Sequence, residues 1–169
     1  PILDDKVTAV KKESNDFRIE TESGGNHLAS SVILGIGRER RKLGLEHENE
    51  WTGKGVSFCS TCDAPLHRDN VVAIVGGGNA AIEGAVLLSK YASTVYLIYR
   101  RGEITRPEPV NLKLLNESKN IIQLLNTNVT SLLGDDGLSQ ISIDKSHNNA
   151  TKLDVDGLFI EIGADPRIE

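Results

Sequence analysis

The sequence has no methionine, one tryptophan and only two cysteines among its 169 residues, and aromatic residues make up 4% of it. The two cysteines, Cys59 and Cys62, close too small a loop to stabilise the fold as a structural disulfide would. No apolar run approaches the roughly 20 residues that span a bilayer, and the N-terminus has no signal-peptide pattern. We therefore expect a soluble, cytoplasmic protein that does not enter a membrane, and a chemical role for the cysteine pair.

The sequence also lacks an excess of positive charge. It has 19 Lys and Arg residues against 24 Asp and Glu, a net charge of −5, and its longest basic run, residues 38–42, is interrupted by Glu39. Nucleic acid is therefore not an expected partner. With 38% hydrophobic residues the chain can form a globular core. Because it begins with Pro1 and has no methionine, we expect it to be a piece of a longer protein.

Two similar series of extended segments indicate two related domains. Alternating patterns at 7–12 and 17–21, separated by polar turns, predict an antiparallel meander leading into a buried strand over 31–37. A second meander is predicted over 129–155, leading into an apolar strand at 157–163.

Between the two series lies a complete strand–helix–strand pattern. Apolar runs at 71–75, 94–99 and 121–125 are typical of strands buried in a parallel sheet, and the spacing predicts helices over 80–91 and 109–118. The predicted fold is α/β: a Rossmann-like three-layer dinucleotide-binding domain of parallel sheet, helices and antiparallel β-meander, plus a partial second domain of the same type.

A glycine-rich turn follows the first of these strands and opens the first helix, which is the context in which G-x-G-x-x-A indicates a dinucleotide site. The first glycine allows the tight turn, the third leaves room for a pyrophosphate, and the last alanine lets the helix pack on the strand. The alternative is a turn that only joins strand to helix. The candidate binding residues are Gly76, Gly77, Gly78, Asn79, Ala80 and Ala81.

The end of the second strand favours NADP(H). An NAD-dependent enzyme is expected to carry Asp or Glu about 20 residues after the glycines, but Tyr99, Arg100 and Arg101 stand there. Two guanidinium groups suit a 2′-phosphate, and Arg106 is a further candidate. Solvated surface arginines are the alternative explanation.

The spacing of Cys59 and Cys62 is that of a reversible disulfide. A zinc site is a weaker alternative because no second C-x-x-C supplies the remaining ligands, and an unreactive buried pair is another. Asp63 follows directly and is placed to exchange a proton with a leaving thiolate, although it also suits a turn or a helix N-cap.

These motifs together resemble the low-molecular-weight, prokaryotic-type thioredoxin reductases, which are class II pyridine nucleotide-disulfide oxidoreductases. The resemblance lies in residues 55–63 and 75–85, and residues 99–101 are similar to the family's His-Arg-Arg. It implies electron transfer from NADPH to FAD, then to the Cys59–Cys62 disulfide, then to thioredoxin or a similar small disulfide protein.

The resemblance also implies roles for single residues. Cys62 would face the flavin, Cys59 would attack the thioredoxin disulfide, and Asp63 would be the acid–base group. Ala164 replaces the family's histidine, so only the backbone at Ile162 and Gly163 is expected near the nicotinamide.

In domain terms, the resemblance assigns residues 1–42 to the C-terminal part of a split FAD-binding domain and 43–69 to a connector carrying the cysteines. Residues 70–163 would form the NAD(P)H-binding domain, and 164–169 would begin the return to the FAD domain. The flavin's own glycine motif and Gly-Asp segment are absent from the 169 residues. We expect FAD only in the full-length parent, a homodimer, and a fragment that binds nucleotide without turnover.

Two alternative functions stay open at this point. One is a stand-alone NADPH-binding dithiol redox module. The other is the core of an alkyl hydroperoxide reductase flavoprotein, which uses the same parts to pass electrons to a peroxiredoxin.

Overall fold

The computed structural model describes residues 2–105 and 107–167. Contacts divide them into two compact units, residues 2–37 with Arg167, and residues 38–166. Among the described residues, no helix has the length and apolar character needed to cross a membrane.

The first unit is a three-stranded antiparallel sheet, of which the alternating patterns predicted the first two strands but not the third. Its strands are β1 (Val7–Glu13), β2 (Asp16–Thr21) and β3 (Asn26–Ala29), in the order β1-β2-β3. Exposed ion pairs join Lys11 to Glu20 and Arg18 to Glu13 across β1 and β2. The sheet therefore carries charges of both signs in matched pairs.

The buried strand expected over residues 31–37 is wrong. The segment forms no strand, and its apolar side chains are solvent-exposed, with Ile33 at 97% and Leu34 at 61%. A strand is buried only when neighbouring strands and a covering layer are available. The described residues of the first unit offer neither beside this segment, so its β-branched sequence alone does not form a strand.

A short antiparallel ribbon, not predicted from the sequence, belongs to the second unit. It pairs β4 (Arg38–Arg40) with β13 (Ala164–Pro166). The Arg41 Nε donates to Asp165 Oδ1 at 3.0 Å, and this hydrogen bond holds the pKa of the Asp165 carboxyl below its ordinary value. The ribbon brings together segments that are more than a hundred residues apart in the sequence.

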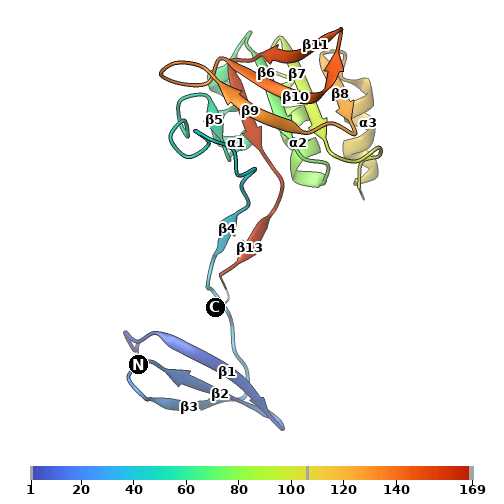
Figure 1. The fold of residues 1–169 in the computed structure, drawn as a ribbon. Coiled ribbons are helices and arrows are strands. Elements are labelled where there is room, and N and C mark those ends of the chain that lie inside the picture. Colours follow the sequence, from blue (N-terminus) through green and yellow to red (C-terminus); the bar gives the residue numbers. More distant parts are fainter. Residues whose placement is uncertain (1, 106, 168–169) are drawn as a thin grey trace. The chain divides into compact units, whose positions relative to one another are not determined.

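The second unit is built on a parallel five-stranded sheet in the order β5-β12-β6-β7-β8 (Figure 1). The three runs predicted as strands form it with the expected bounds: β6 (Val71–Val75), β7 (Thr94–Tyr99) and β8 (Ile121–Leu125). Two further strands are β12 (Gly157–Ile160) and β5 (Val56–Ser57). The pattern of the connector did not predict β5.

Two layers cover the sheet, as predicted (Figure 1). The helices α2 (Asn79–Leu88) and α3 (Pro109–Glu117) lie on one face, where Ile74 and Phe159 pack with Ile82 and Leu88. The antiparallel strands β9 (Val129–Leu133), β10 (Gln140–His147) and β11 (Ala150–Asp154) cover the other face. Alternate residues of β6 point into the two cores, which explains its continuous apolar sequence.

Buried side chains hold the connector, residues 43–69, in a defined conformation. It contains β5, the single-turn helix α1 (Ser60–Asp63) and the 3-10 helix η1 (Ala64–His67), and Trp51 is 2% exposed. Glu48 is also 2% exposed, and its carboxylate accepts hydrogen bonds from the amides of Leu43, Gly44 and Leu45 at 2.8–3.2 Å. A buried carboxylate with three donors fixes the turn that leads to the cysteines.

Replacing Glu48 with alanine is expected to lower the free energy of unfolding by about 3 kcal/mol, because three backbone amides lose the buried carboxylate that accepts their hydrogen bonds. Denaturant unfolding followed by the fluorescence of Trp51, the only tryptophan, measures the change. Glu46→Ala is the matched control, since that side chain is 90% exposed, and its effect should stay within about 0.5 kcal/mol. Equal losses in the two variants would contradict the assigned role.

Candidate active site

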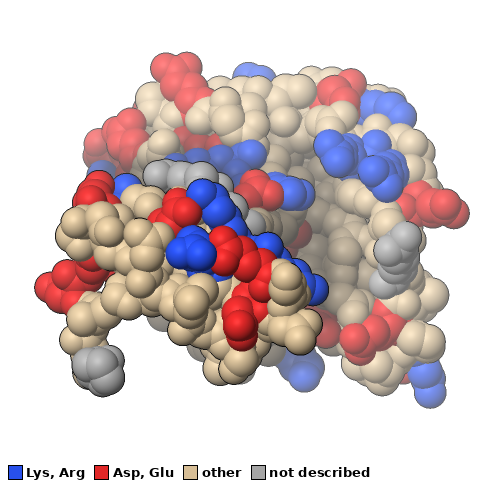
Figure 2. All heavy atoms as spheres, turned by 90° about the horizontal axis from the view of Figure 1, so that it is seen from below, with Lys and Arg blue, Asp and Glu red and all other residues tan. Residues whose placement is uncertain are grey.

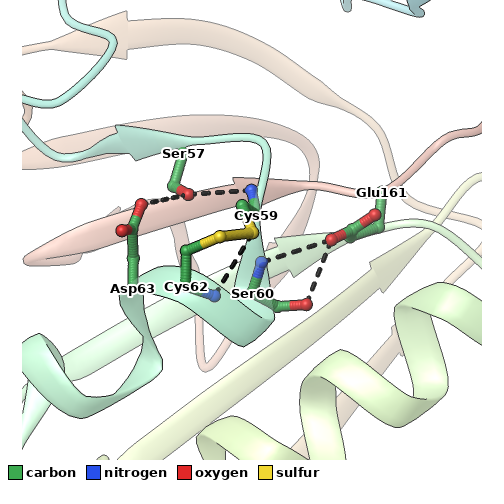
Figure 3. Close-up of a disulfide and its surroundings, with 6 residues drawn as sticks. All are labelled: Ser57, Cys59, Ser60, Cys62, Asp63 and Glu161. Carbon is green, nitrogen blue, oxygen red and sulfur yellow. Dashed lines mark hydrogen bonds between the residues drawn. A yellow bond between two sulfur atoms is a disulfide. The ribbon is translucent and has the colours of Figure 1, made fainter. Parts of the chain in front are cut away.

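The two cysteines form a disulfide at the start of α1 (Figure 3). Cys59 is the N-cap of this helix, and its Sγ accepts a hydrogen bond from the amide of Cys62 at 3.2 Å. Cys59 is half-buried, whereas Cys62 is exposed. The C-x-x-C spacing therefore forms the redox-capable bond that the sequence predicts, with one sulfur-bearing residue accessible to solvent.

Asp63 lies beside the disulfide and is held by Ser57 (Figure 3). The Ser57 hydroxyl donates to Asp63 Oδ2 at 2.7 Å and accepts from the amide of Cys59 at 3.0 Å. Ser57 is 6% exposed and sits on β5, so the sheet edge positions this contact. The Asp63 side chain is thus connected to the cysteine turn through one buried hydroxyl.

On the other side of the turn, Ser60 contacts Glu161, which is not among the residues predicted from the sequence (Figure 3). Both the amide and the hydroxyl of Ser60 donate to Glu161 Oε1, at 3.3 and 3.0 Å. The two residues are 101 positions apart, so no local spacing could reveal the pair. The one available signal is a charged residue interrupting the apolar run of residues 158–162.

The glycine turn is tightly packed on one side and open on the other. Gly76 has φ +149°, and a Cβ there would lie 2.3 Å from the carbonyl oxygen of Glu161. A Cβ at Gly77 would lie 2.3 Å from the Tyr99 ring. At Gly78 a Cβ would meet nothing within 4 Å, and this residue is the N-cap of α2 without a side-chain cap.

The other predicted residues of the turn support α2. Asn79 Oδ1 accepts from the amide of Glu108 at 2.8 Å. Ala81 is buried, and its Cβ would lie 2.7 Å from a Cβ at Gly76, as close helix–strand packing requires. Ala80 lines a pocket together with Cys59 and Glu161.

The segment after β7 folds back over the glycine turn. The Tyr99 hydroxyl hydrogen-bonds the Thr105 hydroxyl at 2.6 Å, and the Thr105 amide donates to Gly77 O at 3.0 Å. Arg100 and Arg101 are exposed, and neither forms an ion pair with a carboxylate of residues 2–105 or 107–167. Arg106 lies outside the described residues.

The predicted nicotinamide-side residues follow β12. Ile162 is half-buried against the core between the sheet and the meander. Gly163 has φ +99°, and its carbonyl accepts from the Arg41 amide at 3.0 Å. Glu161, which precedes them, donates its amide to Val75 O at 2.9 Å, so the end of β12 lies directly beside the glycine turn.

One pocket of about 260 Å³ joins the cysteine turn to α2. Its walls combine the end of β4, the disulfide segment, α2 along most of its length and the residue after β12. The lining residues are Arg40, Cys59, Ser60, Thr61, Ala80, Glu83, Gly84, Leu87 and Glu161. The structure therefore places the dithiol beside the helix whose N-terminus carries the glycine motif. Such a site places thiol–disulfide chemistry next to the helix that the glycine turn opens.

A protein-family model described as pyridine nucleotide-disulphide oxidoreductase matches residues 2–169. The chain belongs to this family. Membership, together with the relatives named thioredoxin reductase, confirms the resemblance that the two motifs indicated.

The relatives are named for two different activities. The chain is 40% identical over 144 residues to a thioredoxin reductase of Mycolicibacterium smegmatis. The matched region covers 85% of this chain and 46% of the relative. It is 39% identical over 170 residues to a glucosaminate ammonia-lyase of Pseudomonas fluorescens, and that matched region covers 98% of this chain and 52% of the relative. The chain thus spans about half the length of the relatives it matches.

A solved thioredoxin reductase from Giardia duodenalis has the same fold. The two superpose with a TM-score of 0.81 at 29% sequence identity, over 98% of this chain and 54% of that one. The predicted fold class is confirmed by this match and by the parallel and antiparallel sheets of the second unit.

His67 gives the site region a pH-dependent group. Burial against the Phe159 ring, whose centroid is 5.2 Å away, lowers the pKa of His67 below 6.5, and the nearby Asp63 and Asp156 carboxylates oppose the shift. The folded state therefore favours the neutral imidazole.

Stability should consequently fall as the pH drops below 6.5, because the unfolded chain takes up a proton that folded His67 resists. In His67→Gln the dependence of stability on pH should be weaker, since the glutamine side chain does not titrate. Unfolding followed by Trp51 fluorescence at several pH values between neutral and acidic measures the slope. Substituting the exposed His27 in the same way is the control and should leave the slope unchanged.

Proposed function

We propose that this chain is the dithiol and nucleotide-binding part of a thioredoxin-disulfide reductase-like flavoenzyme. The observation that carries the proposal is the pocket that Cys59 shares with Ala80 and Glu83 of α2, next to the glycine turn. Family membership and relatives named thioredoxin reductase support it. In the complete enzyme, electrons pass from NADPH through FAD to the disulfide and then to thioredoxin.

The glycine turn fits a nucleotide pyrophosphate. Gly78 leaves open space where a side chain would stand, and no side chain caps the first amides of α2, so these donors are available to an anion. Gly76, Gly77 and Ala81 give the turn its shape, and Asn79 and Ala80 complete the first turn of the helix. When bound, the nicotinamide supplies a hydride, and the backbone at Ile162 and Gly163 would lie beside it.

Arg100 and Arg101 would bind the 2′-phosphate that distinguishes NADP(H) from NAD(H). Both are exposed at the end of β7, close to Tyr99, which packs on the glycine turn. Guanidinium groups without a carboxylate partner are suited to phosphate oxygens. Arg106 is proposed as an additional contact from the sequence alone.

The dithiol step uses groups of this chain. Reduction of the disulfide takes two electrons and two protons and gives two thiols. The Cys59 thiolate then attacks a partner disulfide, forming a mixed disulfide and releasing one partner thiolate. Attack of Cys62 on Cys59 Sγ re-forms the internal disulfide and releases the second thiolate of the partner. Asp63, held by Ser57, transfers a proton to or from the cysteine sulfur.

The flavin does not fit the described residues of the first unit. Residues 2–37 and Arg167 contain one antiparallel sheet and no strand–glycine turn–helix motif that could hold its pyrophosphate. FAD is therefore assigned to the complete enzyme, and this chain is expected to be inactive by itself. The domain bounds 1–42, 43–69, 70–163 and 164–169 belong to the same proposal.

Thioredoxin or a similar small disulfide protein is the proposed partner, and the complete enzyme is a proposed homodimer. Its proposed location is the cytoplasm, where cysteines are kept reduced and disulfides are transient and catalytic. Nucleic acid is not part of the proposal. On the face in Figure 2, Lys and Arg are interspersed with Asp and Glu, in keeping with the net charge of −5.

The double variant Arg100→Ala/Arg101→Ala is expected to raise the Kd for NADPH about 100-fold, because two charge-assisted contacts to phosphate are lost. The Kd for NADH should change less than about threefold, since that nucleotide lacks the 2′-phosphate. Calorimetric titration measures both constants. Lys90→Ala/Lys119→Ala removes two exposed charges elsewhere and serves as the control. An unchanged preference in the arginine variant would sink the assignment.

Trapping tests the dithiol step. The probe is a thioredoxin with a single active-site cysteine, activated as a mixed disulfide with thionitrobenzoate. Reduced Cys62→Ser, which retains Cys59, should release thionitrobenzoate and form the covalent complex about tenfold faster than Cys59→Ser. Because Cys62 is the more exposed residue, exposure alone predicts the opposite order. Equal rates, or no complex with either variant, would contradict the proposal.

A further inference from the structure

The end of β12 contacts the cysteine turn through one carboxylate. Glu161 Oε1 accepts both the amide and the hydroxyl of Ser60, the residue that follows Cys59 (Figure 3). Ser60 is 5% exposed, so this is a buried attachment rather than a surface contact. The carboxylate therefore reaches the backbone of the redox turn directly.

The surrounding packing leaves Ser60 little freedom. A Cβ at Gly84 of α2 would lie 2.8 Å from Ser60 Oγ and 2.7 Å from the Ile74 side chain, so Ser60 fits only because residue 84 is glycine. Glu161 is itself fixed, because its amide donates to Val75 O. Ser60 is thus held between α2 and the end of β12.

Glu161 forms no ion pair with the residues that the structure describes. Among residues 2–105 and 107–167 no Lys, Arg or His nitrogen lies within 4.0 Å of its carboxylate. The other charged residues of the pocket are Arg40 on β4 and Glu83 on α2. On the opposite side of the disulfide stands Asp63, which also acts on His67.

We propose that Glu161 is a positioning residue for the dithiol, which fixes Ser60 and, through its negative charge, opposes thiolate formation at Cys59. The inference rests on the proposed function in that it assumes the disulfide is opened in use. Cys59 and Glu161 line the same pocket, where fields are less screened than in water. A negative charge there disfavours a second one on the sulfur.

The test separates the charge from the hydrogen bonds. Glu161→Gln keeps an oxygen acceptor for Ser60 but removes the charge, whereas Glu161→Ala removes both. The purified protein is reduced with dithiothreitol, which becomes its cyclic disulfide as the two cysteines become thiols. The reductant is then removed under nitrogen. Alkylation of Cys59 by iodoacetamide is followed across a range of pH by mass spectrometry of the peptide.

For Glu161→Gln, the alkylation profile should move to lower pH, and the rate at pH 7 should rise about threefold. More thiolate is present, but each thiolate is a weaker nucleophile, which offsets part of the gain. Glu83→Gln is the matched control: it removes one charge from the same pocket without touching Ser60, and it should shift the profile less. In Glu161→Ala the alkylation profile should also move to lower pH. The Ser60 amide should exchange its hydrogen faster, because it has lost its acceptor.

A Glu161→Gln profile that coincides with that of the unchanged protein, or a Glu83→Gln shift of equal size, would overturn the inference. The assay contains no nucleotide, flavin or thioredoxin. Failure of the proposed function would therefore appear in the nucleotide and trapping experiments, whereas failure of the Glu161 inference would appear only here.

Discussion

The pairing of β12 on both of its edges is the constraint on which the site depends. On one side Phe159 pairs with Ser57 of β5, and on the other Ile160 pairs with Val75 of β6. Because the three strands are parallel, their carboxyl ends lie side by side at the same end of the sheet. In open α/β folds ligands bind beyond the carboxyl ends of the strands. The cysteine turn follows β5, the glycine turn follows β6, and Glu161 follows β12.

This convergence is maintained by close contacts that tolerate no side chain. The carbonyl of Glu161 approaches Gly76, and Ser60 approaches Gly84. Gly76 and Gly84 thus bring the cysteine turn, the glycine turn and the end of β12 within contact of one another. The chemistry proposed for the pocket follows from this packing, since a thiol, a carboxylate and a helix N-terminus acquire their joint properties only when they are adjacent.

Sequence patterns predicted most elements of the second unit, because buried parallel strands and amphipathic helices have strong apolar periodicity. The bounds of β6, β7 and β8 agree with the predicted runs. The same reasoning failed at residues 31–37, where an apolar run has no neighbouring strand, and it missed β5, which is a two-residue strand. An apolar run predicts a strand only where the rest of the chain provides its partner.

The sequence by itself determined the types of chemistry: two cysteines at redox spacing, an adjacent carboxylate, and a glycine turn opening a helix. These are local features, and their spacing along the chain is sufficient to identify them. Only the tertiary structure decided that Glu161, 101 residues from Ser60, contacts the cysteine turn. Ser57 is close to the cysteines in sequence, but it lies on β5, whose pairing with β12 depends on long-range hydrogen bonds and core packing that no local pattern of residues encodes.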